Sequence, residues 1–419
     1  MHEQDSDEMI SMLSRLAWRS VGRNKRRTII TVLSIALGLT FALFFITLAE
    51  GAYYQMIRDS VRMQAGHITL EQKDYRDAPA VDLYIKNPGE LRNRIEALPD
   101  VEETKLLILG QGVARSGNGA VGVAVMGIEP SVEAGSSPLA KKIIKGEFLA
   151  DTDDNLVIIG SSLASRLKLD LEKKLVLTTS DANGDLVDEL CRVKGIFQTG
   201  SDEVDGFLVQ LPINFARKLF TMPEGSATQL GVILKNQGKL NSVLKKIRGM
   251  LNDKDIVALP WREVMPELAA YITLDRTSNY IFQIILITLI LFTIFNTILM
   301  SVLERRREFA ILLAIGTPPG QLQLQVLFET IIFGIIGVGL GLLLGGAIAY
   351  YFRVHGLDIS AFLKEGVTVS GFAMDTKMHA RITAPIMLWS ALIVFFATLL
   401  LSIFPMRRAA RTPFADILR

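Results

Sequence analysis

Four stretches of this chain contain no charged side chain, and each is long enough to cross a lipid bilayer. They are Thr28–Ala49, Thr277–Leu303, Thr330–Phe352 and Ile382–Met406, of 22, 27, 23 and 25 residues. The hydrocarbon core of a bilayer is about 30 Å thick, which takes roughly 20 helical residues, whereas buried helices of soluble proteins have apolar stretches of about 10 to 14 residues. The sequence therefore predicts four transmembrane helices, at residues 28–49, 277–303, 321–352 and 382–406. The third helix is predicted to begin before its charge-free stretch.

Basic residues gather at three places next to these predicted spans. The clusters lie at residues 19–27, before the first span, at 305–307, after the second, and at 407–411, after the fourth. Cytoplasmic ends of membrane-spanning helices retain Lys and Arg. If every span crosses the membrane once, all three clusters fall on one side, which this rule assigns to the cytoplasm.

This orientation divides the rest of the chain between two compartments. Residues 1–27 are predicted to form a cytoplasmic amphipathic helix, 304–320 a cytoplasmic helix and turn, and 407–419 a cytoplasmic tail. Residues 50–276 and the shorter loop 353–381 then lie outside. The predicted fold class is an α-helical membrane protein with four transmembrane helices and a large extracytoplasmic α+β domain inserted between the first and the second.

The inserted segment has the pattern of a folded α+β domain. Runs rich in β-branched residues and bounded by turn formers predict strands at 67–71, 120–128, 155–160, 174–179, 191–197 and 229–235. Asn183-Gly184 predicts a tight turn between two of these strands. Apolar residues that recur with helical spacing between Leu240 and Leu251 predict a half-buried helix.

The chain on both sides of the inserted segment is predicted to be helical. Residues 50–64 contain no proline and continue the first span, while residues 261–276 lead into the second span with an interruption only at Pro266. Helical connectors act as semi-rigid spacers, whereas Gly/Ser linkers are flexible. We therefore expect two helical stalks that transmit force between the membrane and the inserted domain.

The chain carries no motif of an enzyme active site. It lacks the Gly-x-x-x-x-Gly-Lys-Ser/Thr phosphate loop and the Gly-x-Ser-x-Gly nucleophile turn. The four histidines are scattered and form no ligand cluster for a metal. The single cysteine, Cys191, is expected to be a buried inert thiol. The sequence predicts neither catalysis nor a metal site, and we expect no nucleic-acid partner.

A distinctive segment joins the second and third spans. Glu304 to Ile315 can form a short helix, and Gly316 suits the left-handed position that ends it. Thr317-Pro318 predicts the start of the next helix, with Thr as the cap and Pro at the first helical position. Two interpretations remain open from the residues alone: the helix anchors the loop in the lipid interface, or it docks on a cytoplasmic protein.

Several of these segments resemble a known family. The stretches ERRREFAILLAIGTPPGQL (304–322), MISMLSRLAWRSVGRNKRRTIITVLSIALG (9–38) and PMRRAARTPFADILR (405–419) are similar to permeases of the MacB/LolC/FtsX superfamily of ABC transporters. The resemblance extends over essentially the whole chain, and the inserted segment resembles the Porter and Sabre subdomains of these permeases. Four spans with a large insertion favour the layout of LolC and LolE, the lipoprotein-releasing permeases.

The resemblance implies a noncatalytic permease subunit that forms a dimer with a second copy or a paralogue. In the family, the helix between the second and third spans sits on a separate cytoplasmic ATPase. That partner would bind ATP and Mg, so this chain would need no cofactor. Closure of the ATPases would swing the outer domains through the stalks, a cycle called mechanotransmission. The implied location is the cell inner membrane, multi-pass, with the inserted domain in the periplasm.

The implied function is the extraction or export of a lipoprotein or another amphiphile, with a periplasmic carrier or adaptor as a candidate partner. Two alternatives remain open. One is an efflux permease for drugs, peptides or toxins that works with an outer-membrane channel, as in MacB. The other is a regulator that conveys ATPase motion to a cell-wall hydrolase, as in FtsX.

Three groups of residues are candidate sites. The expected ATPase-coupling residues are Glu304, Arg305, Arg306, Arg307, Glu308, Phe309, Leu312, Leu313 and Gly316. Two apolar stripes at helical spacing could line a cargo cavity or a dimer seam, or could simply face lipid: Ile35, Leu39, Ala42 and Ile46 in the first span, and Ile281, Ile285, Thr288 and Phe292 in the second.

The third group is a stripe of Gly337, Gly341 and Gly345, which predicts close helix packing, within one subunit more often than between two. Glu329 stands immediately before the third charge-free stretch. We expect this carboxylate to sit in the membrane interface, because a charge deeper in the bilayer is costly. The alternative is an ion pair with an arginine of the 305–307 cluster or of the ATPase.

Overall fold

A computed structural model describes most of the chain. The described residues are 25–359 and 377–410, with 15, 17–19 and 21–23 near the N-terminus and 368–369 and 372–373 in the last loop. Much of the predicted N-terminal helix, of the loop 353–381 and of the tail lies outside them. The chain divides into two units: a helical bundle (residues 1–54, 274–358 and 377–419) and an inserted domain (55–273, with 359–376).

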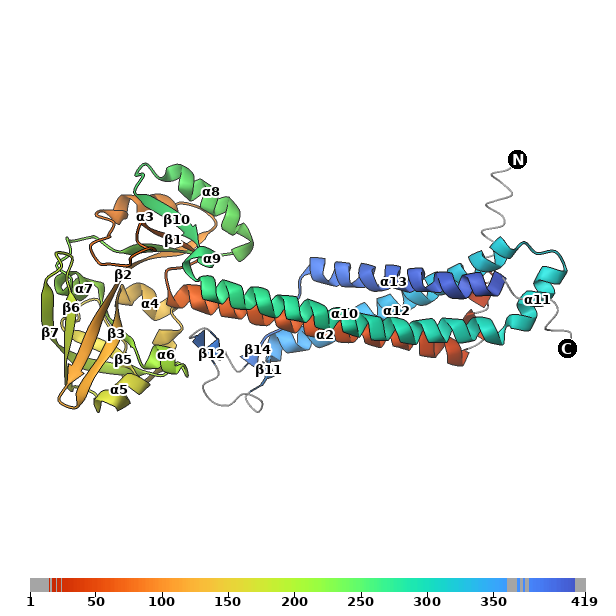
Figure 1. Cartoon of the computed structure of the whole chain (residues 1–419), viewed down its shortest axis with the longest axis horizontal. Coiled ribbons are helices and arrows are strands. Elements are labelled where there is room, and N and C mark those ends of the chain that lie inside the picture. Colours follow the sequence, from red (N-terminus) through yellow and green to blue (C-terminus); the bar gives the residue numbers. More distant parts are fainter. Residues whose placement is uncertain are drawn as a thin grey trace. The chain divides into compact units, whose positions relative to one another are not determined.

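Four helices form the bundle, and all are long and apolar enough to cross a membrane. They are α2 (Lys25–Met63), α10 (Pro266–Glu304), α12 (Pro319–His355) and α13 (Ala384–Ala410), drawn in Figure 1. The first three contain a whole charge-free stretch each, and α13 contains all of the fourth except Ile382 and Thr383. Their limits follow local signals, since proline stands in the first turn of α10 and of α12, and Gly356, with φ +69°, ends α12.

The glycine stripe of α12 packs against α2. A Cβ atom added to Gly337 would lie 2.7 Å from Cβ of Ile35, and one added to Gly341 would lie 2.9 Å from Cβ of Leu39. Such distances leave no room for a side chain, so the glycines allow the two helices to approach closely. This packing lies within one chain, as expected for the stripe.

The same contact corrects one prediction. Ile35 and Leu39 have no exposed surface, and Ala42 is 3% exposed. These residues point into the bundle of their own subunit, so they do not line a seam with a second permease. The helical period showed that α2 has an apolar stripe, but it could not show that α12 covers it.

The inserted domain is built on a ten-stranded sheet. The strand order is β10-β1-β9-β2-β3-β8-β5-β7-β4, and β6 pairs with β2 and β7. The strands are β1 (Ile68–Gln72), β2 (Val101–Ser116), β3 (Gly119–Ile128), β4 (Ile143–Gly146), β5 (Leu156–Gly160), β6 (Lys174–Ser180), β7 (Leu186–Phe197), β8 (Leu208–Pro212), β9 (Gln229–Leu234) and β10 (Ile256–Pro260).

Short helices complete the domain. They are α3 (Pro88–Glu96), α4 (Pro130–Ser136), α5 (Ser161–Leu167), α6 (Asp202–Asp205), α7 (Ile213–Leu219), α8 (Leu240–Met250) and α9 (Trp261–Val264). Two-residue strands follow in the last loop: β11 (Leu357–Asp358) with β14 (Lys377–Met378), and β12 (Thr368–Val369) with β13 (Phe372–Ala373). The core is made mainly of aliphatic side chains from both ends of the sheet, together with Phe215 and Phe220.

All six predicted strands are present, and so are the predicted turn and helix. They correspond to β1, β3, β5, β6, β7 and β9. The turn at Asn183-Gly184 joins β6 to β7, with Gly184 at φ +88°. Val243, Leu244 and Ile247 of α8 are buried, as the helical spacing indicated. Cys191 is buried in β7, and burial, with the charge of Glu189, raises the pKa of its thiol to about 12.

The long strand β2 holds the two parts of the sheet together. Its first residues pair with β9, and its later residues pair with β3 and β6. A side chain at Gly110, in the middle of β2, would lie 2.3 Å from the ring of Phe220. Glycine is therefore required there by close packing, although it lowers the strand propensity of the sequence.

Candidate functional site

The segment between the second and third membrane helices forms a separate short helix, α11 (Arg306–Ala314). The prediction that this helix begins at Glu304 is wrong, because Glu304 is the last residue of α10. Arg305 lies between the two helices, with φ −96° and ψ 12°. The chain therefore turns one residue later than expected, at the first arginine of the cluster.

The C-terminal end of α11 is closed by its own backbone. The amide of Gly316 donates to the carbonyl of Leu313 over 3.1 Å, and that of Thr317 donates to Leu312 over 3.0 Å. Gly316 has φ +97°, the positive value expected for it. Helix α12 starts at Pro319, one residue after the predicted start, and Pro318 takes the cap position. The short helix thus ends in a defined turn.

One face of α11 is packed against the bundle. Phe309 is 1% exposed and Ala310 is 4% exposed. Phe309 lies in an apolar cluster with Val302, Leu322 and Val326, to which the half-buried Leu312 and Leu313 also belong. The prediction that Phe309 presents itself to a partner protein is therefore wrong, since the largest apolar side chain of α11 fixes the helix to its own chain.

A network of ion pairs fixes the other side of the helix. Nε of Arg305 lies 2.9 Å from Oε2 of Glu308, and its Nη1 lies 2.6 Å from Oε1 of Glu329. Arg23 reaches the second oxygen of Glu308 at 2.5 Å. Glu329 is buried, and the ion pair with an arginine of the 305–307 cluster is present. The network joins the N-terminal segment, α11 and α12.

These contacts shift the pKa values of Arg305 and Glu308, which both lie outside the membrane spans. The hydrogen bond from Arg305 lowers the pKa of Glu308, and the positive charges of Arg305 and Arg23 add to the effect. Burial by itself would lower the pKa of Arg305, but the charges of Glu329 and Glu308 outweigh it and raise the pKa. Arg305 and Glu308 therefore stay ionised at neutral pH.

The outward face of α11 carries a short apolar stripe. Ile311 is 61% exposed and Ile315 is 74% exposed. Arg307, also exposed, precedes Ile311 by four residues, so the three side chains share one face. Arg307, Ile311 and Ile315 thus form a small exposed surface on a helix that is fixed to its own chain. Such a helix face can bind in a groove of another protein.

The stripe predicted for the second span has a different environment from that of the first. Ile281, Ile285 and Phe292 are 57%, 53% and 63% exposed on α10, and Thr288 is exposed as well. Ile46 of α2 is half-buried. Of the two predicted stripes, the one on α10 is thus available to lipid, cargo or a second permease.

A buried lysine attaches the end of α2 to the sheet of the inserted domain. Nζ of Lys105, in β2, donates to the carbonyl oxygen of Arg62 over 2.7 Å and to Oε1 of Glu133 over 2.8 Å. The Lys105 side chain has no exposed surface, and that of Glu133 has 2%. Arg62 also pairs with Glu102 of β2 at 2.6 Å. The last turn of α2 is therefore held by β2 and α4.

His67 connects the two places where the chain enters and leaves the inserted domain. Its amide donates to the carbonyl of Val232, and its carbonyl accepts a 2.9 Å hydrogen bond from the amide of Trp261. The amide of Leu234 donates to Nδ1 of the imidazole at 3.2 Å. Burial, together with the charge of Arg62, lowers the pKa of His67 to about 4. The ring is neutral at physiological pH and serves as a structural acceptor.

The inserted domain also contains a cavity of about 720 Å³. Its walls include Tyr75, Leu107, Leu109, Val125 and Met126. The charged residue Arg76 at this cavity is bound to the buried carboxylate of Glu71 through two hydrogen bonds of 2.6 and 2.9 Å. The guanidinium of Arg76 is thus compensated by Glu71, while Asp82 and Asp181 also line the cavity and give it a mixed apolar and acidic wall. Within the described residues, no group of His, Cys, Asp and Glu could hold a metal ion.

Two protein families match the chain. Residues 28–250, more than half of the chain, match the family described as MacB-like periplasmic core domain. Residues 280–414 match the family described as FtsX-like permease C-terminal. The first match takes in nearly all of α2 and most of the inserted domain, and the second takes in α10 from Tyr280 onward, α11, α12 and α13.

Individual relatives agree with these matches. The chain is 25% identical to the lipoprotein-releasing system transmembrane protein LolC of Xylella fastidiosa (strain 9a5c), over 93% of this chain and 92% of that protein. It is also 25% identical to LolC of Neisseria meningitidis serogroup B, over 94% of each. It is 24% identical to the macrolide export ATP-binding/permease protein MacB of Hahella chejuensis, over 81% of this chain and 52% of that protein. With four membrane helices and an inserted α/β domain, the chain belongs to the MacB/LolC/FtsX superfamily and is an ABC transporter permease.

Proposed function

We propose that this permease, with a separate ATPase subunit, extracts or exports a lipoprotein or another amphiphile by moving its inserted domain. The observation that carries the proposal is the continuity of α2 and α10, each of which is a single helix of 39 residues shared by the bundle and the inserted domain. Similarity to LolC along nearly the whole of both chains supports lipoproteins as the cargo. The partner ATPase would bind ATP and Mg.

The two long helices are suited to carry force. At 1.5 Å per residue, a helix of this length spans about 58 Å. A displacement at one end of such a rod reaches the other end, where a Gly/Ser linker would absorb it. The buried pair of Lys105 and Glu133 then passes the motion of the last turn of α2 to the sheet.

The ATPase is proposed to dock on the outward face of α11. Arg307, Ile311 and Ile315 form this face, while Phe309 and the ion pairs of Arg305 keep the helix in place. A lipid-anchoring role for the two isoleucines is the competing interpretation. The charged neighbours and the closed turn at Gly316 favour docking on a protein.

A second permease, identical or paralogous, is proposed to pack on the exposed stripe of α10. Ile281, Ile285 and Phe292 offer apolar surface for it. Cargo chains could share that seam, since acyl chains and these side chains are equally apolar. A periplasmic carrier or adaptor would then receive the cargo.

The protein is a multi-pass membrane protein, and we infer from its basic clusters that both termini are cytoplasmic. A cysteine introduced at Asn183 should react with a membrane-impermeant maleimide from the outside only. The native Cys191 does not interfere, because its thiol is buried and its pKa is raised to about 12. Labelling of that position only after the inner membrane is opened would invert the proposed orientation.

Efflux is the second candidate function. The match of residues 28–250 to the MacB-like periplasmic core domain favours it. Reconstitution separates the two: proteoliposomes with the ATPase, an acylated lipoprotein and a soluble carrier should release lipoprotein on addition of ATP. Transport of a macrolide without lipoprotein release would favour efflux. A regulator of a cell-wall hydrolase would transport neither.

Insertion of two glycines after Tyr54 tests the mechanism in the same assay. The insertion should soften α2 and abolish release, while ATP hydrolysis continues at a similar rate. Two glycines inserted after Gly184, in an exposed turn of the inserted domain, serve as the matched control and should leave release intact. Undiminished release by the first insertion mutant, at normal membrane levels, would show that force takes another route.

A further inference from the structure

A groove of about 270 Å³ opens in the helical bundle between α2, α10 and α13. Its two ends differ in polarity. The end near Tyr53 is polar, with Glu50, Arg276, Asn279 and Gln283 in its wall, and the other end is apolar. The apolar wall is formed by Ile46, Ile287, Ile386, Trp389 and Ile393.

The polar end is an ordered network. The Tyr53 hydroxyl donates to Oδ2 of Asp275 over 2.5 Å, and Nδ2 of Asn279 donates to the same hydroxyl over 2.5 Å. Nη2 of Arg276 lies 3.1 Å from Oε2 of Glu50, and its guanidinium lies over the Tyr53 ring at 5.1 Å. The five side chains of the network are thus held by one another before any ligand arrives.

One hydrogen-bond donor in this network has no acceptor among the described residues. Nε of Arg276 is buried and has no hydrogen-bond partner among the described residues. A buried charged donor without an acceptor loses its hydration and gains nothing in exchange. The guanidinium is therefore suited to an anionic oxygen that enters the groove from outside the chain.

The groove extends from the expected level of the lipid head groups to that of the hydrocarbon chains. Glu50 directly follows the charge-free stretch of α2, and Arg276 directly precedes that of α10. Charged and aromatic side chains at such positions mark the level of lipid head groups. Ile287 and Ile393 lie within charge-free stretches, and therefore at the level of the hydrocarbon chains.

The groove is separate from the stripe proposed as the dimer seam. Along α10 its walls use Arg276, Asn279, Tyr280, Gln283 and Ile287. At 100° per residue, these positions cluster on one side of the helix, and Ile281, Ile285, Thr288 and Phe292 cluster about 150° away. A ligand in the groove would therefore lie beside α13, away from a second permease.

We propose that this groove binds one phospholipid of the surrounding bilayer that carries a zwitterionic amine head group. The phosphate takes the free Nε position of Arg276, the ammonium faces the carboxylate of Glu50, and one acyl chain lies along Ile287, Trp389 and Ile393. The network contains two carboxylates, Glu50 and Asp275, and one guanidinium. An anionic lipid would lack the cation that balances the second carboxylate, so the zwitterion is preferred.

The test measures lipid retention and needs neither ATPase nor transport, so its result is independent of the proposed function. The full-length permease is first placed in nanodiscs that contain equal parts of phosphatidylethanolamine and phosphatidylglycerol. It is then extracted into detergent, and the lipids that stay bound are counted by native mass spectrometry. One phosphatidylethanolamine per chain should be retained, with about tenfold less phosphatidylglycerol. Arg276→Gln should lower retention about tenfold, since it removes a charge-assisted hydrogen bond.

Matched variants separate the groove from the rest of the lipid-facing surface. Ser390→Trp, within the groove wall, should fill it and abolish retention, whereas Leu388→Trp, on the exposed face of α13, should not. Arg353→Gln, an exposed cation at the end of α12, is the control for loss of charge. Equal retention by Ser390→Trp and Leu388→Trp, or equal retention of the two lipids, would overturn the proposal. Recovery of an acylated peptide instead of a phospholipid would assign the groove to cargo and overturn it as well.

Discussion

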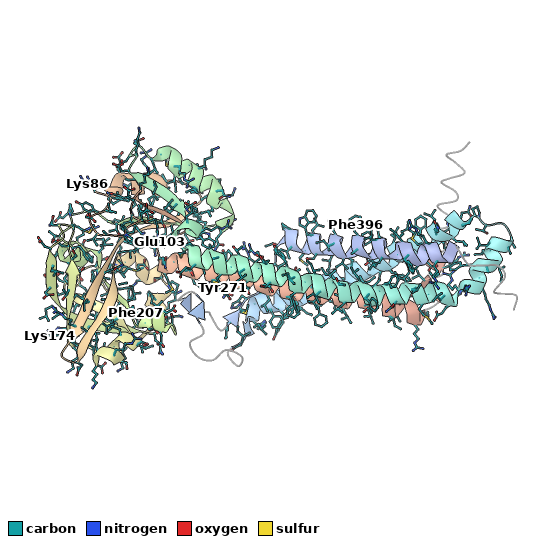
Figure 2. All side chains as sticks on the ribbon, in the orientation of Figure 1. Lys86, Glu103, Lys174, Phe207, Tyr271 and Phe396 are labelled. Carbon is teal, nitrogen blue, oxygen red and sulfur yellow. The ribbon has the colours of Figure 1, made fainter. Side chains whose placement is uncertain are left out.

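The helical bundle and the inserted domain are held together in opposite ways. The bundle exposes many large apolar side chains, as Leu343, Leu400 and Phe396 show at 71%, 71% and 60% exposure, and Figure 2 labels Phe396 on α13. Between its helices it buries glycine, serine and threonine together with a smaller set of aliphatic residues such as Leu39. The inserted domain buries its aliphatic residues and exposes charged ones, among them Lys174. The difference follows from the surroundings, because lipid is as apolar as leucine and gives helices no hydrophobic reason to associate.

Each unit therefore depends on a different kind of contact for its specific structure. In the bundle, small residues allow α2 and α12 to approach until backbone and side chains touch. In the inserted domain, a hydrophobic core supplies most of the stability, and buried ion pairs such as that of Lys105 and Glu133 fix particular elements to it. The predictions below test whether this division holds.

The largest expected effect is at Lys105. Lys105→Ala leaves the Glu133 carboxylate buried without its partner, and loss of one member of such a pair typically costs about 3 to 5 kcal/mol. Hydrogen exchange of the β2 amides in the full-length chain should show a loss of protection of this size. Lys145→Ala, which removes an exposed pair with Asp170, should leave protection unchanged.

The double variant Lys105→Met, Glu133→Leu distinguishes charge burial from packing. It removes both charges and keeps the volume nearly constant, so it should recover most of the lost protection. Equal losses in the single and double variants would mean that the ion pair itself, rather than the uncompensated charge, stabilises the joint between α2 and β2.

The next effect concerns the bundle. Gly341→Leu places a side chain where a Cβ atom alone would come within 2.9 Å of Leu39 and 3.0 Å of the Ala36 carbonyl. Overpacking of this kind costs about 1 to 3 kcal/mol. Thermal unfolding of the detergent-solubilised chain should shift downward. Gly339→Leu is the matched control, because nothing lies within 4 Å of its Cβ position, and an equal shift in both variants would refute the close packing of α2 and α12.

The smallest expected effect is on the binding of the partner ATPase, and the permease should remain folded. Ile311→Asp should weaken binding of the partner ATPase about tenfold or more, since a charge replaces a contact in a desolvated interface. Affinity purification of the permease with its ATPase measures this loss. Ile335→Asn, an equally exposed isoleucine on α12, should retain the ATPase if the effect is specific to α11. Full retention by the Ile311→Asp, Ile315→Asp double variant would place the docking surface elsewhere.

The comparison also explains what could be predicted from the sequence. The four membrane helices were visible because a bilayer requires long stretches without charge. Six strands were visible because their residues are β-branched and bounded by turn formers. The long strand β2 was not among the predicted strands, since Gly110 and Gly112 interrupt its pattern, and their reason, the contact with Phe220 and Thr178, exists only in the folded chain.

The sequence did not allow us to predict which neighbour each apolar helix face contacts. Ile35 and Ile281 both belong to apolar stripes, but α12 covers the first and leaves the second exposed. In α11, Phe309 and Ile311 are equally apolar, and only the position of the bundle shows that Phe309 is buried. Helical periodicity identifies a face, while the identity of its neighbour depends on tertiary structure.

The hydrogen bonds of Tyr53 and His67 have a mechanical consequence. Within the bundle, Tyr53 fastens α2 to Asp275 of α10. Within the inserted domain, the carbonyl of His67 fastens the strand that follows α2 to Trp261, just before α10. Both contacts lie near the outer ends of the two helices, at the C-terminal end of α2 and the N-terminal end of α10, and they oppose sliding of one helix along the other at that level. Under the proposed function, the two helices would therefore deliver force to the inserted domain together and not one at a time.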